Sequence, residues 1–311
     1  MIDFFEAIWE IFSAESTYIN GALFAGLLVF AATGEWVAER AGTLNISVEA
    51  MLLAGAFTSA VAYDQTSSVP VGILAGVIGG MIVAGVQAEM SHRLVADQFV
   101  VGLTLNILVF GLTGFLDREL APATKIADKF EVPLLVELPL IGQALFGQPW
   151  PFYLLYPLLP ISWWLVYRTR WGLEVRAVGE DPQPADVSGI NVNLRRRQSI
   201  YYAGITSGLG GAFLIFVQIG QFEDSIVGGR GFIAIAAVIF GGWTLWGTVG
   251  GCIVFAGALS FRLSVQGLGY QLNSELLQSL PFVVTLVGMA IFAHRVKPPG
   301  ALARPFVRGL T

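Results

Sequence analysis

The chain has 311 residues, of which 55% are hydrophobic and 13% are charged, about half the charged fraction of a typical soluble domain. Together with a mean hydropathy of +0.70, this excludes an ordinary soluble protein and predicts an all-α, polytopic integral membrane bundle. A single cysteine excludes a disulfide framework, and 17 basic against 22 acidic residues offer no basic surface for nucleic acid.

Residues 1–19 are predicted to form an amphipathic helix on the outer membrane surface, because Phe4, Ile8 and Phe12 recur at helical spacing among acidic residues. The acidic start also argues against a secretory signal peptide. Residues 20–311 are then a single transmembrane domain. About nine apolar segments in it are candidate spans: 20–38, 45–62, 70–90, 98–116, 151–167, 199–219, 231–243, 247–262 and 276–293.

The segments 231–243 and 247–262 are short and glycine-linked, so they are expected either as two spans or as a broken, re-entrant pair. Residues 42–55 can also be aligned with residues 229–242, with four identities. An inverted repeat would give this similarity, and such repeats meet at transport sites near the bilayer midplane. Chance similarity between two apolar segments is the alternative.

Basic residues fix the predicted orientation. Twelve of the 17 lie on one side, at 35–44, 89–97, 168–197 and 294–311. Because cytoplasmic loops collect Lys and Arg, this side is predicted to be cytoplasmic, with the N-terminus outside and the C-terminus inside the bacterial plasma membrane. Residues 117–149 are then an external loop and residues 168–197 a cytoplasmic segment.

Small residues recur every four positions in two spans. They are expected to line one face of each helix and to let a neighbouring helix approach closely. The stripes are Gly72, Gly76, Gly80 and Ala84, and Gly204, Gly208 and Ala212.

Glu49 is the one carboxylate that the predicted spans place at depth rather than at an end, and Asn45 is expected one helical turn before it on the same helix face. Because a buried ionisable group is costly, Glu49 is expected to face a cavity or a partner. It is either part of a polar translocation path or a brace that bonds a neighbouring helix. Thr104 and Asn106 pose the same question.

The sequence holds no catalytic constellation and no metal site. His92 and His294 sit at predicted span ends, with interfacial roles. A P-loop lysine follows glycine and precedes Ser or Thr, whereas Lys125, Lys129 and Lys297 follow Thr, Asp and Val. The chain is therefore predicted to be no enzyme and to bind no cofactor.

The predicted cytoplasmic segment contains a turn, a short helix and a glycine stop. It is either a simple connection or the lever through which a soluble partner moves the membrane domain. Its candidate residues are Gly179, Glu180, Asp181, Pro182, Ala185, Asp186, Gly189 and Ile190.

Several motifs together resemble permease subunits of bacterial ABC importers, in the nucleoside and simple-sugar branch of the ribose and branched-chain amino-acid permease family. The most specific one is residues 39–57, where Asn-Ile-Ser-Val-Glu-Ala resembles the family's Asn-Ile-Gly-Val-Glu-Gly. Asp97-Gln98 with Leu105-Asn106, residues 179–191, residues 228–237 and Leu280-Pro281-Phe282 complete the order. Ser47 and Ala50 replace usual glycines, and a proline common near Leu245 is missing.

The resemblance implies a transport subunit whose partners supply the rest of the machine. Cytoplasmic ATPase subunits, which bind ATP and Mg²⁺, would dock on residues 180–190. A second permease chain, identical or related, would complete the path, and an extracytoplasmic lipoprotein would deliver the solute. Asn45 and Glu49 would line or brace the path. The alternatives are a stand-alone secondary transporter coupled through Glu49, and an importer of another small polar solute such as a branched-chain amino acid.

Overall fold

The computed structural model describes residues 4–267, 279, 283, 287 and 297–308. Within these residues the chain is helical and has no strand, only an isolated bridge between Lys129 and Pro149. The predicted all-α class is therefore confirmed. The helices are α1 (Phe4–Ser13), α2 (Glu15–Arg40), α3 (Val48–Thr66), α4 (Val69–His92), α5 (Gln98–Leu120), α6 (Gly142–Phe146), the 3-10 turn η1 (Trp150–Leu154), α7 (Leu155–Arg168), α8 (Arg170–Glu180), α9 (Pro182–Val187), α10 (Val192–Phe213), the π-helical turn η2 (Leu214–Ile219), α11 (Arg230–Phe240) and α12 (Leu245–Gly267).

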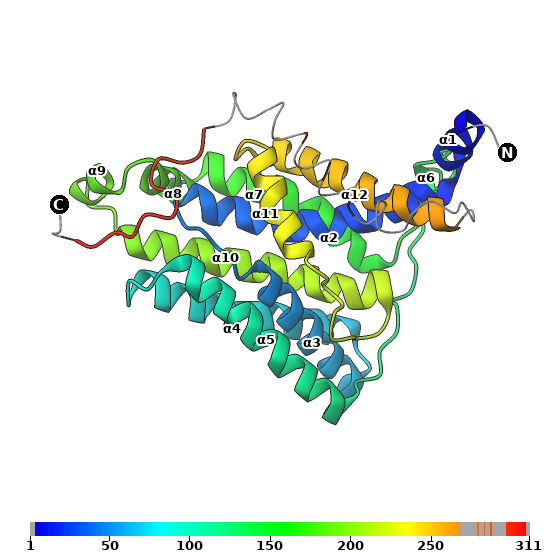
Figure 1. The fold of residues 1–311 in the computed structure, drawn as a ribbon, viewed down its shortest axis with the longest axis horizontal. Coiled ribbons are helices and arrows are strands. Elements are labelled where there is room, and N and C mark those ends of the chain that lie inside the picture. The colour runs from blue at the N-terminus through cyan, green and yellow to red at the C-terminus, as the bar shows by residue number, and fades with distance from the viewer. Residues whose placement is uncertain (1–3, 268–278, 280–282, 284–286, 288–296, 309–311) are drawn as a thin grey trace.

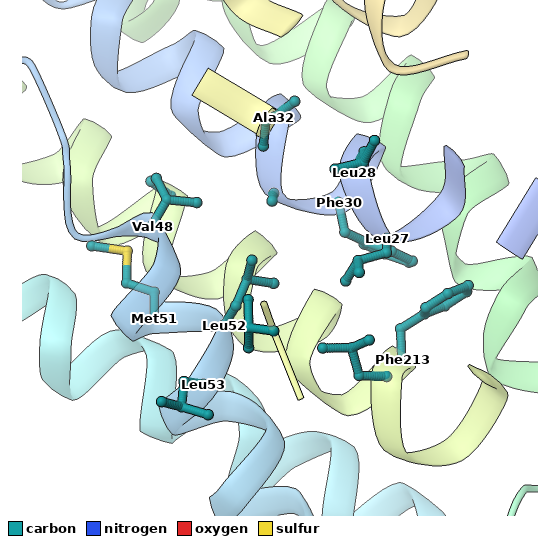
Figure 2. Close-up of a cluster of buried hydrophobic side chains, with 14 of the residues drawn as sticks. Leu27, Leu28, Phe30, Ala32, Val48, Met51, Leu52, Leu53 and Phe213 are labelled. Atoms are coloured by element: carbon teal, nitrogen blue, oxygen red, sulfur yellow. The ribbon is translucent and has the colours of Figure 1, made fainter. Parts of the chain in front are cut away.

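The bundle is organised around α10, which packs against α2, α3 and α4 (Figure 1). On one side of it lie α3, α4 and α5, and on the other lie α2, α7, α11 and α12. The largest hydrophobic cluster joins α2, α3 and α10, where Leu27, Leu52 and Phe213 interdigitate (Figure 2). Lipid gives helices no hydrophobic reason to associate, so this close packing is what holds the bundle together.

The glycine stripes of α4 and α10 face each other, so the close helix approach that their spacing predicted occurs between these two helices. A Cβ atom on Gly80 would lie 2.9 Å from Gly208 Cα and would also meet the Gly204 carbonyl. Gly55 of α3 joins the same contact, since its Cβ would lie 2.8 Å from Gly208 Cα. Three backbones therefore meet where only glycine fits.

The connection between α5 and α7 covers one end of the bundle. The Ala127 N–H donates to the carbonyl of Phe216 at 2.8 Å, and the Thr124 hydroxyl donates to that of Gly220 at 2.6 Å. Both acceptors lie in or just after η2, where the change of helical pitch frees carbonyls from the regular α-helical pattern. The connection therefore satisfies polar groups that the end of this helix leaves open.

Within the described residues, five helices are long and apolar enough to cross a membrane: α2, α4, α5, the continuous α10–η2 segment and α12. The predicted count of about nine spans is not confirmed. Of the glycine-linked pair, α12 is full length, whereas the 11 residues of α11 cover only about 16 Å, half a hydrocarbon core. The predicted span 276–293 lies outside the described residues except for 279, 283 and 287.

Several predicted boundaries also shift. α1 ends at Ser13 and α2 begins at Glu15, so residues 15–19 belong to the first span rather than to the surface helix. α5 takes residues 117–120 from the predicted external loop, and α10 takes residues 192–197 from the predicted cytoplasmic segment. Apolar continuity predicts only the apolar part of a helix, and polar turns can extend the helix at either end.

The alignment of residues 42–55 with residues 229–242 does not pair equivalent positions. Gly229 directly precedes α11, whereas Gly42 lies six residues before α3. Gly242 follows α11 with φ +63°, whereas Gly55 lies in the middle of α3. In this register the similarity gives no structural repeat, and an inverted repeat in another register stays a prediction.

Predicted outer and inner elements lie at opposite ends of the bundle (Figure 1). α1 and α6 occupy one end, and α8, α9 and the C-terminal residues occupy the other. The two groups of elements therefore lie on opposite sides of the bundle, and which side is cytoplasmic stays a prediction.

Candidate functional site

The α2–α3 linker, residues 41–47, is not helical although it lies inside the bundle. Side chains from other helices bond its backbone: the Arg196 Nε–H donates to Ala41 O at 3.2 Å, and Gln98 Oε1 accepts from the Leu44 N–H at 2.8 Å. Buried irregular backbone is tolerated only where other protein groups satisfy its N–H and C=O groups in this way.

Asn106 of α5 connects the end of this linker to the start of α3. Its amide N–H donates to Ile46 O at 2.9 Å, and its Oδ1 accepts from the Ala50 N–H at 2.9 Å. The first N–H groups of a helix have no intrahelical acceptor. Asn106 therefore caps α3 from a different helix.

Asn45 is turned away from Glu49. Its amide donates to Glu35 Oε2 at 2.9 Å, and its Oδ1 accepts from the Ser47 hydroxyl at 2.8 Å. The expectation that Asn45 and Glu49 share a helix face is wrong, because α3 begins only at Val48.

Glu49 joins the beginnings of α3 and α11. Its two carboxylate oxygens accept from the Gly229 and Gly231 N–H groups, each at 2.7 Å. A Cβ atom on Gly231 would lie 2.6 Å from the Glu49 nitrogen, so the two helix starts touch. The negative charge also complements the positive end of the α11 dipole. Through these contacts Glu49 holds the two helix starts together. Its place in the substrate path stays a prediction.

Thr104 does not join this group. It lies on the exposed face of α5, and its hydroxyl donates to the carbonyl of Val100 in its own helix at 2.8 Å. The structure thus places Asn106 of α5 and the start of α11 against the first turn of α3, which holds Glu49, and leaves Thr104 on the surface of the chain.

Two buried carboxylates of α2 were missed by the sequence interpretation. Glu35 and Glu39 are fully buried, so Glu49 is not the only carboxylate at depth. Glu35 bonds Asn45, and Glu39 accepts from the indole N–H of Trp243, whose carbonyl accepts from Trp36 Nε1 at 2.8 Å. Glu35 lies inside the predicted span 20–38, and that position was the signal that could have found it.

His92 lies at the end of α4, as expected, but is buried in the protein, with its Nε2 3.0 Å from the Thr43 hydroxyl of the linker. His294 lies outside the described residues. No group of three or more His, Cys, Asp or Glu that could hold a metal occurs in the described part of the chain.

The predicted cytoplasmic helix exists as α9, with Pro182 at its first position and Gly189 at φ +86° after its end. The Asp181 carboxylate caps it by accepting from the Gln183 N–H at 3.2 Å. Ala185 and Ile190 turn inward onto a small apolar cluster, whereas Val187 is 89% exposed at the tip.

Charged residues around α9 pair with neighbouring segments. Glu180 lies 3.9 Å from Arg40 at the end of α2, and Asp186 lies 3.1 Å from Arg308. The Gly179 carbonyl accepts from the Ala301 N–H at 2.9 Å. The segment is therefore tied to the membrane domain at its base and presents its tip outward.

The fold and site together define a helical membrane protein with one half-length helix, an irregular buried linker and a helical segment projecting from one end. Residues 17–287 match the family described as branched-chain amino acid transport system / permease component. The chain belongs to this permease family.

Relatives of known name match nearly the whole chain. The guanosine ABC transporter permease protein NupQ of Bacillus subtilis is 30% identical over 302 residues, which are 92% of this chain and 95% of the relative. The nucleoside ABC transporter permease protein NupC of Lactococcus lactis is 31% identical over 298 residues, 91% and 93% of the two chains. The putative glucose ABC transporter permease protein TsgC13 of Haloferax volcanii is 33% identical over 277 residues, 86% and 84%.

Proposed function

We propose that this chain is the membrane permease of an ABC importer for nucleosides. Simple sugars are the alternative class of solute. The observation that carries the proposal is the similarity to two nucleoside permeases over more than nine-tenths of each chain. The chain itself hydrolyses nothing, and ATP and Mg²⁺ belong to a separate ATPase subunit.

The proposed path runs beside the start of α3, between α5 and α11. Asn106 and Glu49 hold the two helix starts there, Asn45 holds the linker, and Thr104 adds a hydroxyl on the exposed face of α5. Amides and hydroxyls on an apolar wall suit a neutral polar solute. A second permease chain, identical or related, would face this surface and complete the path, with lipid around the rest.

The proposed dock for the cytoplasmic ATPase is the tip of α9, from Pro182 to Gly189. An exposed Val187 flanked by Asp186 and Ser188 gives a small apolar contact with a polar rim, as in ordinary protein interfaces. An extracytoplasmic binding lipoprotein would dock at the opposite end, where α1 and α6 lie (Figure 1). The chain would then lie in the plasma membrane with its N-terminus outside and its C-terminus in the cytoplasm.

The stand-alone alternative uses Glu49 as a proton or cation site. In the structure both of its oxygens already accept backbone N–H groups, which favours the bracing role.

Affinity purification of the tagged chain in mild detergent, with mass spectrometry of the co-purifying proteins, tests the assembly. We expect a P-loop ATPase and a lipoprotein. Uptake by the chain alone in vesicles, collapsed by an uncoupler, would instead establish the secondary transporter.

Uptake of radiolabelled guanosine by the assembled complex tests the solute class. We expect excess unlabelled nucleosides to compete and leucine not to compete. Competition by glucose alone, with no guanosine uptake, would move the proposal to sugars.

A further inference from the structure

The C-terminal segment, residues 297–308, lies between the α8–α9 segment and the α2–α3 linker. The Ala301 N–H donates to Gly179 O at 2.9 Å on one side, and the Ala303 N–H donates to Gly42 O at 3.2 Å on the other. Two backbone hydrogen bonds only two residues apart therefore connect the base of the proposed dock to the buried linker.

Arg196 of α10 strengthens this junction from inside. Its guanidinium, fully buried, donates to Ala41 O at 3.2 Å, Ala301 O at 3.4 Å and Arg304 O at 2.7 Å. The rigid fork of an arginine can hold several acceptors in one fixed arrangement, which a lysine cannot do. A buried cation that bonds carbonyls of two segments fixes the position of one relative to the other.

The same C-terminal segment also contacts the proposed dock, α9. Phe306 packs onto the apolar cluster that Ala185 of α9 forms with Val178 and Val192, and Arg308 pairs with Asp186 at 3.1 Å. Cavities of about 260 and 380 Å³ flank this strip of chain, one beside Asn191 and one beside Pro182. The segment is thus held from Ala301 to Arg308 and has free space beside it.

We propose that residues 297–308 and Arg196 form the link that carries movement of α9 to the α2–α3 linker, with Arg196 as the positioning residue. The inference rests on the proposed ATPase dock and extends it. Contacts run without interruption from α9 through Phe306 and Arg304 to Arg196 and Ala41. Beyond them Asn45 and Asn106 hold the linker and the start of α3.

Gly300→Val tests the link outside the membrane. A Cβ atom there would lie 2.6 Å from Glu180 O, so the substitution separates the C-terminal segment from the end of α8. Arg196→Lys tests it from inside by keeping the charge and losing the fork. Lys297→Ala, an exposed change in the same segment, is the matched control.

Each variant is purified with the ATPase that accompanies the wild-type chain and is reconstituted with the binding protein. We expect the ATPase to stay bound to both variants while guanosine uptake per assembled complex falls about tenfold, within the usual range of coupling between sites. Hydrogen exchange at residues 41–47 should respond to Mg-ATP in the wild type and the control but not in the variants.

Unchanged uptake per assembled complex would overturn the link, and so would loss of the ATPase from Gly300→Val, because the segment would then be part of the dock itself. If no ATPase accompanies the wild-type chain, the proposed function fails first. That result is distinct from a failure confined to the variants.

Discussion

A single carboxylate, Glu49, holds together the beginnings of two helices that are 180 residues apart in the sequence. The two glycines beside Arg230 also shape this junction: a Cβ atom on Gly231 would lie 2.6 Å from the Glu49 nitrogen, and Gly229 has φ +82°, a conformation that favours glycine. Arg230 itself turns to the Phe24 ring, 5.3 Å from its centroid. The site is therefore a tight junction whose geometry is set by hydrogen bonds to backbone rather than by an ion pair.

Replacing Glu49 tests this junction. Glu49→Ala leaves two N–H groups without an acceptor, and each unsatisfied buried group costs about 1–3 kcal/mol, so we expect a clear drop in the thermal midpoint of the purified chain. Glu49→Gln keeps one oxygen acceptor and should lose less. Thr104→Val, which removes an exposed hydroxyl, should change stability by about 0.5 kcal/mol or less. Equal midpoints for Glu49→Ala and the Thr104 control would contradict the bracing role.

The pairing of Glu39 with Trp243 gives a second prediction. Trp243→Phe keeps an aromatic ring but removes the indole N–H, so we expect a destabilisation of about 1–3 kcal/mol from the unsatisfied carboxylate. Trp246, 64% exposed and three residues further on, offers the matched control in Trp246→Phe. Denaturation of both variants in the same detergent measures the difference. A loss no larger in Trp243→Phe than in the control would show that the bond to Glu39 contributes little.

At the scale of elements, the contact between α4 and α10 depends on the absence of side chains. Gly80, Gly204 and Gly208 bring the two backbones so close that a Cβ atom on any of them would overlap a carbonyl oxygen of the facing helix. Close approach maximises dispersion contacts between helices, which is the attraction that remains in lipid.

Gly80→Ala should therefore force α4 away from α10 and destabilise the bundle by about 1–3 kcal/mol, the usual cost of overpacking. The matched control is Gly111→Ala on α5, where a Cβ atom would meet nothing within 4 Å. Since alanine favours helix over glycine, the control should be neutral or slightly stabilising. Thermal unfolding of both chains measures the difference, and a similar loss of stability in both would contradict the role of the α4–α10 contact.

At the scale of the whole molecule, the two ends of the bundle differ in how they are built. One end is covered by the irregular connection after α5, and the other carries α8, α9 and the C-terminal segment as one hydrogen-bonded unit (Figure 1). Such a unit can receive a soluble partner at its tip while its base stays attached to the membrane helices.

Reversing the charges of this unit should uncouple transport. In Glu180→Lys with Asp186→Lys, each new lysine lies beside an arginine, Arg40 or Arg308, and repels it. We expect uptake and ATPase stimulation to be lost with normal membrane expression. Glu180→Gln with Asp186→Asn, which removes charge without reversing it, should retain most uptake because surface ion pairs contribute only about 0–1 kcal/mol. Normal uptake in the lysine variant would exclude α9 as the dock.

Much of the architecture was predictable because its signals are local. The apolar runs placed α2, α4, α5 and α10, and the four-residue glycine spacing predicted which helix faces meet closely. The proline start and glycine stop of α9 were equally readable, since caps depend on neighbouring residues. The number of spans could not be predicted in the same way, because α11 has the apolar composition of a span but only 11 residues.

The sequence by itself thus determined the class of protein, the placement of its long helices and the residues that could be functional. Only the tertiary structure decided their partners: Asn45 bonds Glu35 rather than lining a face with Glu49, and Glu39 meets Trp243 from 204 residues away. The physical reason is that hydropathy and spacing report whether a position is buried and on which face. Which polar group it meets depends on how separate helices dock, and that is fixed by packing over the whole bundle.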